Sequence, residues 1–230
     1  MTATFEHTRL RLESYFDRTA AETWAQLTSD APVSRIRATV RAGRDEMRQG
    51  LLRALPWDLS GRRILDAGCG VGQLSAELAA RGAEVVGVDI APNLLDVARR
   101  RVPHALQARI RFQAGDMLDP GLGDFDHVVA MDSLIHYEVA DIAHALERLA
   151  VRTSGTILFT VAPRTRLLAA MHRVGKLFPR DDRSPAIQPV RERALRAALK
   201  ARPGLANHHL TVRRRVARGF YISEAMELAR

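Results

Sequence analysis

The chain has 230 residues, and 47% of them are hydrophobic, which is enough to build a core without disulfides or structural metals. Its single cysteine excludes an internal disulfide, and no stretch approaches the ~20 apolar residues that a membrane span requires. The net charge of +9 favours anionic partners such as nucleic acid, acidic lipid or a small polycarboxylate, although a solvated basic surface explains it as well.

Two helices are expected first. Residues 5–28 carry Phe5, Leu12, Phe16, Trp24 and Leu27 broadly on one face. Asp30-Ala-Pro breaks this pattern, and a second helix follows over 33–54. We expect residues 1–55 to form a helical lid or arm, and 56–230 to form the main domain.

From residue 62 onward, short strands alternate with helices. Strands are predicted at 62–66, 84–89, 109–113, 125–131 and 156–161, and helices at 73–81, 92–101 and 138–152. This alternation predicts an α/β fold with a parallel sheet and helices on both faces. An insertion at about 164–205, with helices over 164–178 and 190–201, precedes an antiparallel pair of strands at 208–215 and 219–223.

A glycine-rich turn lies between the first strand and its helix. It reads Asp66-Ala-Gly68-Cys-Gly70-Val-Gly72, and glycines let the backbone turn sharply and approach a ligand closely. Asp66 would repel a pyrophosphate, whereas a sulfonium and an amino group would be attracted to it. The turn therefore differs from the dinucleotide-binding pattern G-x-G-x-x-G.

Acidic residues follow the next two strands as well. Asp89, with Ile90 after it, ends the second strand, where a carboxylate can accept hydrogen bonds from both ribose hydroxyls. Asp116 and Met117 follow the third strand, where the acid can accept from an adenine amino group and the methionine can pack on the ring. Any one of these acids alone would commonly be a helix cap or a turn residue. Acids at three successive strand ends predict a nucleoside-containing ligand.

These motifs resemble the class I S-adenosylmethionine (SAM)-dependent methyltransferases. The family's first motif matches 64–72, and its "FD-x-V" segment matches the run from Phe125 to Asp132. The resemblance implies a Rossmann-like sheet, SAM as cofactor with S-adenosylhomocysteine (SAH) as product, and Asp132 among the cofactor-binding residues.

Five further segments resemble a narrower family, the magnesium protoporphyrin IX O-methyltransferases of (bacterio)chlorophyll biosynthesis. They are 14–17 with Trp24, 131–137 ("MDSLIHY"), 160–165, 176–179 ("KLFP") and 219–223 ("GFYIS"). The resemblance implies methylation of one propionate carboxylate of the porphyrin, and a magnesium chelatase subunit as a candidate partner. Magnesium would arrive inside the porphyrin, so no protein metal site is expected. The family's plant and cyanobacterial members tend to carry a tyrosine near the position of Thr28, which this chain lacks.

The resemblance also suggests roles at the acceptor side of the site. His136 is the preferred catalytic residue, with Tyr15 on the predicted lid as a second candidate, and Tyr137 and Arg164 are expected to contact the substrate. A propionate is already ionised at neutral pH, so the protein mainly has to align it and exclude water. Simpler interpretations stay open: a structural histidine capping the next helix, a tyrosine that packs the lid, and a solvated arginine.

Two other functions stay open. One is O-methylation of a quinone or phenol, whose hydroxyl would need a base such as His136. The other is a SAM-binding regulator or RNA-binding protein without catalysis, although no aromatic interleaving or zinc spacing supports nucleic-acid binding. The absence of a signal-peptide pattern indicates a cytoplasmic location, and an arginine-rich segment at 164–180 could touch an anionic membrane peripherally.

Overall fold

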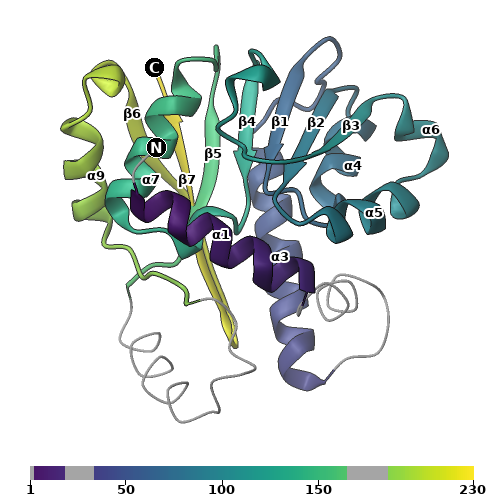
Figure 1. The fold of residues 1–230 in the computed structure, drawn as a ribbon, viewed down its shortest axis with the longest axis horizontal. Helices are drawn as coiled ribbons and strands as arrows, with labels where there is room; N and C mark the ends of the chain where they lie inside the picture. The colour runs from purple at the N-terminus through teal and green to yellow at the C-terminus, as the bar shows by residue number, and fades with distance from the viewer. Residues whose placement is uncertain (1–2, 19–33, 165–185) are drawn as a thin grey trace.

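The protein forms one seven-stranded sheet flanked by helices in the computed structural model, which describes residues 3–18, 34–164 and 186–230 (Figure 1). The strand order is β3-β2-β1-β4-β5-β7-β6. The strands are β1 (Arg63–Ala67), β2 (Glu84–Asp89), β3 (Ile110–Ala114), β4 (His127–Ala130), β5 (Ile157–Val161), β6 (His209–Arg218) and β7 (Tyr221–Ala229). The first five are parallel, whereas β7 runs antiparallel to both β5 and β6. The predicted α/β fold class is confirmed.

The helices lie on both faces of the sheet, as predicted. They are α1 (Ala3–Arg18), α3 (Arg35–Arg53), α4 (Gln73–Ala80), α5 (Pro92–Arg101), α6 (His104–Gln107), α7 (Val139–Ala150) and α9 (Glu192–Lys200), with 3-10 turns η1 (Pro120–Leu122), η2 (Leu134–His136) and η4 (Pro203–Leu205). Strand 84–89 and helix 92–101 agree with the prediction residue for residue, because a short, almost continuously apolar and buried run marks the strand and a proline at the first helical position marks the helix.

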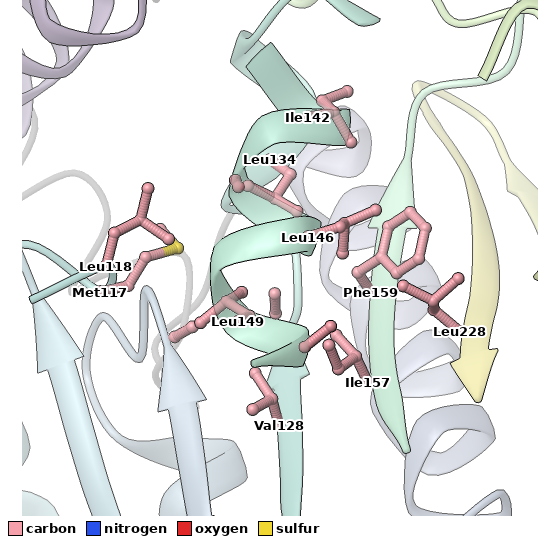
Figure 2. Packing of buried hydrophobic residues seen from close by; sticks show 14 of the residues in the cluster. Met117, Leu118, Val128, Leu134, Ile142, Leu146, Leu149, Ile157, Phe159 and Leu228 are labelled. Carbon is pink, nitrogen blue, oxygen red and sulfur yellow. The ribbon is translucent and has the colours of Figure 1, made fainter. Parts of the chain in front are cut away.

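Two apolar layers hold the sheet between its helices. On one face, Leu146 and Leu149 of α7 pack against Ile157 and Phe159 of β5 (Figure 2). On the other face, Met47, Leu51 and Leu52 of α3 join Leu74 and Leu78 of α4 over β1 and β4. The described part of the predicted N-terminal arm therefore contributes a full helix, α3, to the layer beneath the sheet. A division of the chain at residue 55 stays a prediction.

The closing strand pair is longer than predicted. We expected the last strand to end at residue 223, but β7 continues to Ala229 and pairs with β5 over Val161 to Ile157. Glu224 and Glu227 interrupt the apolar pattern and hide the strand in the sequence. Glu227 is buried because Arg213 of β6 pairs with it, which offsets the cost of removing its charge from water.

Several predictions fall outside the described residues. They concern the second half of the predicted helix 5–28 with Trp24 and Thr28, the helix 164–178 and the segment 176–179. Among the described helices, none has both the length and the apolar character needed to cross a bilayer.

Candidate functional site

A pocket of about 980 Å³, counted with its open mouth, lies at the carboxyl ends of β1, β2, β3 and β4. Its floor is the glycine-rich turn, and α1 crosses over it (Figure 1). The lining includes ten of the twelve predicted site residues: Asp66, Gly68, Gly70, Asp89, Ile90, Asp116, Met117, Asp132, His136 and Tyr137. These ten residues, predicted from the sequence, therefore line one pocket in the structure.

The glycine turn adopts a backbone that side chains would not tolerate. Gly68, Gly70 and Gly72 all have positive φ, at 80°, 54° and 75°. A Cβ on Gly68 would lie 2.4 Å from Cβ of Ser133, so the turn after β1 and the segment after β4 are in direct contact. Hydrogen bonds from the amides of Gly68 and Cys69 to the Val88 carbonyl, at 2.8 and 3.0 Å, hold the turn against β2.

Two buried carboxylates face the pocket beside this turn. Asp66 is 1% exposed and accepts a 2.6 Å hydrogen bond from the Ser75 hydroxyl. Asp89 accepts from the amides of Gly70 and Ala91, at 2.8 and 2.9 Å. Burial raises the pKa of the Asp66 carboxyl to about 7, and it also raises the pKa of Asp89.

Neither carboxylate belongs to any of the salt bridges found among the described residues. Two buried acids without a cation favour a positively charged ligand, since a cation would offset the cost of burying them. A sulfonium or ammonium group fits this arrangement, and a pyrophosphate does not.

The third predicted acid lies across the pocket. Asp116 follows Gly115, whose φ of 146° few other residues adopt, and its Oδ1 accepts from the amide of Leu118 at 2.8 Å. Met117, 8% exposed, lines the same wall. An acid with free acceptor capacity beside an apolar wall suits a flat base that carries an amino group.

Asp132 has the most constrained backbone of the site. It is the one non-glycine residue with positive φ, 55°, in the described part of the chain. Its carboxylate pairs with Arg44 of α3 and accepts a 3.0 Å hydrogen bond from the Tyr221 hydroxyl. The Thr160 hydroxyl accepts from the Asp132 amide at 2.8 Å. Contacts from three elements therefore impose a conformation that costs of order 1–3 kcal/mol by itself.

His136 lies in η2, directly after this segment, and is 9% exposed. Its ring centroid is 6.0 Å from that of Phe16 in α1, and its Nδ1 is 3.4 Å from the Ala186 carbonyl oxygen. The helix that follows begins with Glu138 at its N-cap, which makes no side-chain cap hydrogen bond. His136 is part of the pocket lining.

Tyr137 points toward α1, the helix that crosses the pocket. Its ring stacks on Phe5 with the centroids 4.5 Å apart, and burial raises the pKa of its phenol. It thus contributes to the pocket wall and anchors α1 at the same time.

Two predicted residues are not part of the lining. Tyr15 is half-buried on α1 with its ring edge-on to Phe16, at 5.2 Å between centroids, and Phe16 is the aromatic residue that reaches the pocket. Arg164 follows β5 with an exposed side chain, and its amide donates to the Val190 carbonyl at 2.9 Å.

The structure adds polar lining residues that the sequence analysis missed. Arg44 and Arg48 lie one turn apart on α3, and Arg9 lies on α1. Their four-residue spacing on α3 marks a shared face. In a chain this rich in arginine, however, nothing local distinguishes these three from the others.

The lid helix α1 is fastened at both ends. At its start, the Thr4 hydroxyl donates to Asp141 of α7 at 3.0 Å. At its end, the side-chain amide of Asn93, in α5, donates to the Asp17 carbonyl at 2.9 Å. The helix therefore crosses the pocket from α7 to α5.

Sequence profiles of two families match the chain. The profile described as "Magnesium-protoporphyrin IX methyltransferase C-terminus" matches residues 130–230, and a "Methyltransferase domain" profile matches residues 64–155.

Individual relatives point the same way. The chain is 51% identical to a magnesium-protoporphyrin O-methyltransferase of Rhodobacter capsulatus over 99% of both chains. It is 36% identical to a ubiquinone biosynthesis O-methyltransferase of Xanthomonas oryzae pv. oryzae, over only 54% of each. The crystal structure of magnesium protoporphyrin IX methyltransferase from Synechocystis PCC 6803 with bound SAH superposes with a TM-score of 0.79. It shares 26% identity, over 96% of this chain and 99% of that one.

Proposed function

The chain belongs to the magnesium-protoporphyrin O-methyltransferase family, and we infer from this that it transfers a methyl group from SAM to a propionate carboxylate of magnesium protoporphyrin IX. The observation that carries the inference is the end-to-end similarity to the Rhodobacter capsulatus relative. The product would be the monomethyl ester, an intermediate of bacteriochlorophyll biosynthesis, and SAH would be the second product.

The pocket residues suit this cofactor. When bound, SAM supplies an electrophilic methyl group on a sulfonium. Asp66 would face its cationic end, Asp89 would accept from the ribose hydroxyls, and Asp116 would accept from the adenine amino group. Gly68 and Gly70 let the backbone approach, while Ile90 and Met117 pack on the ring systems. Arg44, which pairs with Asp132, and Arg48, one turn further along α3, would provide positive charge for a carboxylate.

On the acceptor side, His136 is the proposed catalytic residue. The propionate is ionised at neutral pH, so His136 has to orient one oxygen toward the methyl group rather than remove a proton. The apolar side chains of Phe16 and Leu12 over the pocket exclude water from the reacting atoms. Tyr137 stays a proposed contact at the wall, and Tyr15 a proposed contribution from the lid. Arg164, exposed after β5 at the same edge of the sheet, is proposed to meet the second propionate.

The test is an incubation of the purified protein with SAM and magnesium protoporphyrin IX, read by chromatography and mass spectrometry. Parallel incubations use metal-free protoporphyrin and a catechol-type quinone precursor. The catechol is included because the ubiquinone biosynthesis relative matches about half of this chain, 54%. A monomethyl ester formed preferentially from the magnesium porphyrin supports the function. Methylation of the catechol alone would replace it with the quinone alternative, and binding of SAM without any transfer would point to a non-catalytic protein.

We also propose that the porphyrin reaches the enzyme from an anionic membrane surface or from a magnesium chelatase subunit, because a flat macrocycle is largely apolar. Ile36 at the start of α3 and Phe220 in the β6–β7 hairpin are each 55% exposed. Arg37 follows Ile36, and Arg218 lies two residues before Phe220. Gly219 packs on Thr39, so the two apolar side chains belong to one corner. Apolar tips flanked by arginines favour acidic lipid.

Flotation with liposomes rich in acidic phospholipid tests the membrane part of this proposal. Phe220→Ser should reduce binding, whereas Trp57→Ser, at an exposed position outside this corner, should not. Equal binding of both variants would mean that this corner is not the membrane contact. If the unmodified protein does not bind the liposomes at low salt, delivery of the porphyrin by a protein is the remaining part of the proposal.

A further inference from the structure

One arginine holds the start of the loop that connects β3 to β4 (residues 115–126). Arg152 lies two residues after the end of α7, and its two terminal nitrogens donate to the carbonyls of Met117 and Asp119. Phe125 contacts the arginine twice. Its amide donates to the Arg152 carbonyl at 2.8 Å, and its ring centroid is 5.9 Å from the guanidinium carbon. The backbone of Arg152 is thus fixed beside the segment that leads into β4, while its side chain reaches the loop.

The guanidinium of Arg152 is used for its geometry rather than for an ion pair. Within the described residues it pairs with no carboxylate, and the side chain is half-buried. Burial lowers the pKa of the Arg152 guanidinium, so its contacts must offset the cost of keeping the charge there. The planar fork fits two acceptors at once, and a charged donor makes a stronger hydrogen bond than a neutral one. Two such bonds fix the direction of the backbone that accepts them.

The backbone that accepts these bonds presents Asp116 to the pocket. The carbonyl of the Met117–Leu118 peptide accepts from Arg152. The amide of the same peptide donates to Asp116 Oδ1 at 2.8 Å, and a bond of 3.1 Å from the Asp119 amide to the Asp116 carbonyl closes the turn. Asp116 and Met117 line the pocket. A continuous chain of hydrogen bonds therefore runs from the guanidinium through one peptide to a pocket carboxylate.

We propose that Arg152 is a positioning residue for the adenine of SAM, acting through the Met117–Leu118 peptide on Asp116. A cation at the carbonyl end polarises the peptide and strengthens the hydrogen bond at its amide end. One oxygen of Asp116 is then held by that amide, and the other is left to accept from the 6-amino group of the base. The inference rests on the adenine contact proposed above for Asp116, and it does not depend on the methyl acceptor.

Arg63 provides a matched control in the same loop. It begins β1, and its terminal nitrogens donate to the carbonyls of Leu122, at 2.8 Å, and Asp124. Its guanidinium carbon is 4.4 Å from the centroid of the same Phe125 ring. Arg63 therefore fastens the far end of the loop by the same chemistry, at carbonyls that lie beyond the turn at Asp116.

The loop should stay folded without either arginine. Leu118 is buried in the apolar layer that includes Leu149 of α7 (Figure 2), and Leu122 is buried in the same layer. Loss of one arginine should therefore change the direction of the backbone without releasing the loop. Methionine is the suitable replacement, because it keeps an apolar stem and removes the donors.

The experiment compares, by calorimetry, the binding of SAH with that of its purine analogue, which lacks the 6-amino group. The unmodified protein should bind SAH about 10- to 100-fold more tightly, the usual effect of a hydrogen bond to a charged group. Arg152→Met should reduce this preference by about 3- to 10-fold, because groups in one hydrogen-bond network are coupled, while its affinity for the purine analogue should stay within about twofold. Arg152→Lys keeps the charge without the planar fork and should recover part of the preference.

Arg63→Met separates this role from a general loosening of the loop. Both methionine variants lose two bonds to carbonyls, so both should lower Tm to a similar extent, but only Arg152→Met should lose preference for adenine. An unchanged preference in Arg152→Met would overturn the inference. Equal weakening of both ligands in that variant would overturn it too, and so would the same loss of preference in Arg63→Met.

Two further outcomes distinguish this inference from the proposals on which the site is built. An unmodified protein that does not prefer SAH over the purine analogue would remove the adenine contact of Asp116 and the inference with it. A protein that keeps the preference but forms no ester from the magnesium porphyrin would overturn only the proposed function. If Arg152→Met does not fold, the comparison of the two ligands is made with Arg152→Lys, and an unchanged preference there would overturn the inference.

Discussion

The Tyr221 hydroxyl lies 3.0 Å from Oδ1 of Asp132, although the two residues are 89 positions apart in the chain. Tyr221 begins β7 and Asp132 lies two residues after the end of β4, with β5 between these strands. Arg44 of α3 completes the group through an ion pair with the same carboxylate. The helical layer and the two halves of the sheet therefore meet at one carboxylate beside the pocket.

Tyr221→Phe should weaken this junction without changing its packing. The ring keeps its contact with Gly43, but the carboxylate loses one hydrogen bond. We expect the free energy of unfolding to fall by about 1.5–3 kcal/mol, the contribution of a hydrogen bond to a charged group. Denaturant unfolding with SAH calorimetry measures both stability and site geometry. The control is Phe220→Ala at the neighbouring exposed position, which should change neither. An unchanged unfolding midpoint for Tyr221→Phe would contradict the prediction that this hydrogen bond stabilises the fold.

SAM affinity should rise with pH through neutrality. Burial raises the pKa of Asp66 to about 7, so the free protein holds a proton there at pH 6, and a cationic ligand must displace it. Affinity should then increase by up to about tenfold per pH unit below 7 and level off above it. Calorimetry in buffers of different ionisation enthalpy should detect proton release at pH 6.

Asp66→Asn provides the control for this linkage. It should bind SAM more weakly than the unmodified protein at pH 8, with little dependence on pH. The same raised pKa implies that the ligand-free protein loses stability as pH rises from about 4 to about 7 and no further above that, because over this range the unfolded chain gives up the proton more readily than the buried carboxyl does. A flat pH profile of SAM affinity in the unmodified protein would be inconsistent with a protonated Asp66.

His136→Ala should reduce kcat by about 10²- to 10³-fold, within the usual range for a residue that aligns or exchanges protons with the reacting group. SAH affinity should change little if the ring contacts the acceptor, as proposed, and not the cofactor. The measurement is initial-rate kinetics with saturating SAM. His104→Ala, at an exposed position in α6, is the matched control and should be fully active. Wild-type turnover in His136→Ala would exclude the proposed role.

Phe5→Ala should free one end of the lid. Phe5 is 1% exposed and stacks on Tyr137, so its removal takes away the main apolar anchor of α1. We expect SAH to dissociate at least ~10-fold faster, because release requires local opening, which becomes more frequent when a helix loses its buried contacts. Stopped-flow displacement of SAH measures the rate. Leu10→Ala removes a 52% exposed side chain from the same helix and should leave the rate unchanged. Equal rates in both variants would mean that α1 does not limit release.

Much of the fold could be predicted because its signals are local. The strands before Gly68 and Asp89 are short apolar runs, and the glycine turn and Pro92 mark where the following helices begin. The same holds for the cofactor side of the site. Parallel strands present their carboxyl ends at one edge, so acids that follow three strands in sequence must meet in space.

The rest depends on contacts that no local pattern records. Arg44 reaches Asp132 across 88 positions, and nothing near either residue predicts the other. Phe16 rather than Tyr15 faces the pocket because of the rotation of α1, which the docking of Phe5 and Leu12 sets. Ser133 reads in the sequence as an ordinary polar residue. Only the contact with Gly68 shows how its hydroxyl is enclosed.

The position of β7 between β5 and β6 has a consequence for synthesis of the protein. β7 follows both neighbours in the chain, so during translation β5 leaves the ribosome with one edge uncovered. Open strand edges invite pairing with other chains until they are covered. Tyr221 emerges equally late, and Arg44 and Asp132 lack their third partner until then. A ribosome that pauses before Tyr221 would therefore expose a nascent chain that is prone to aggregate.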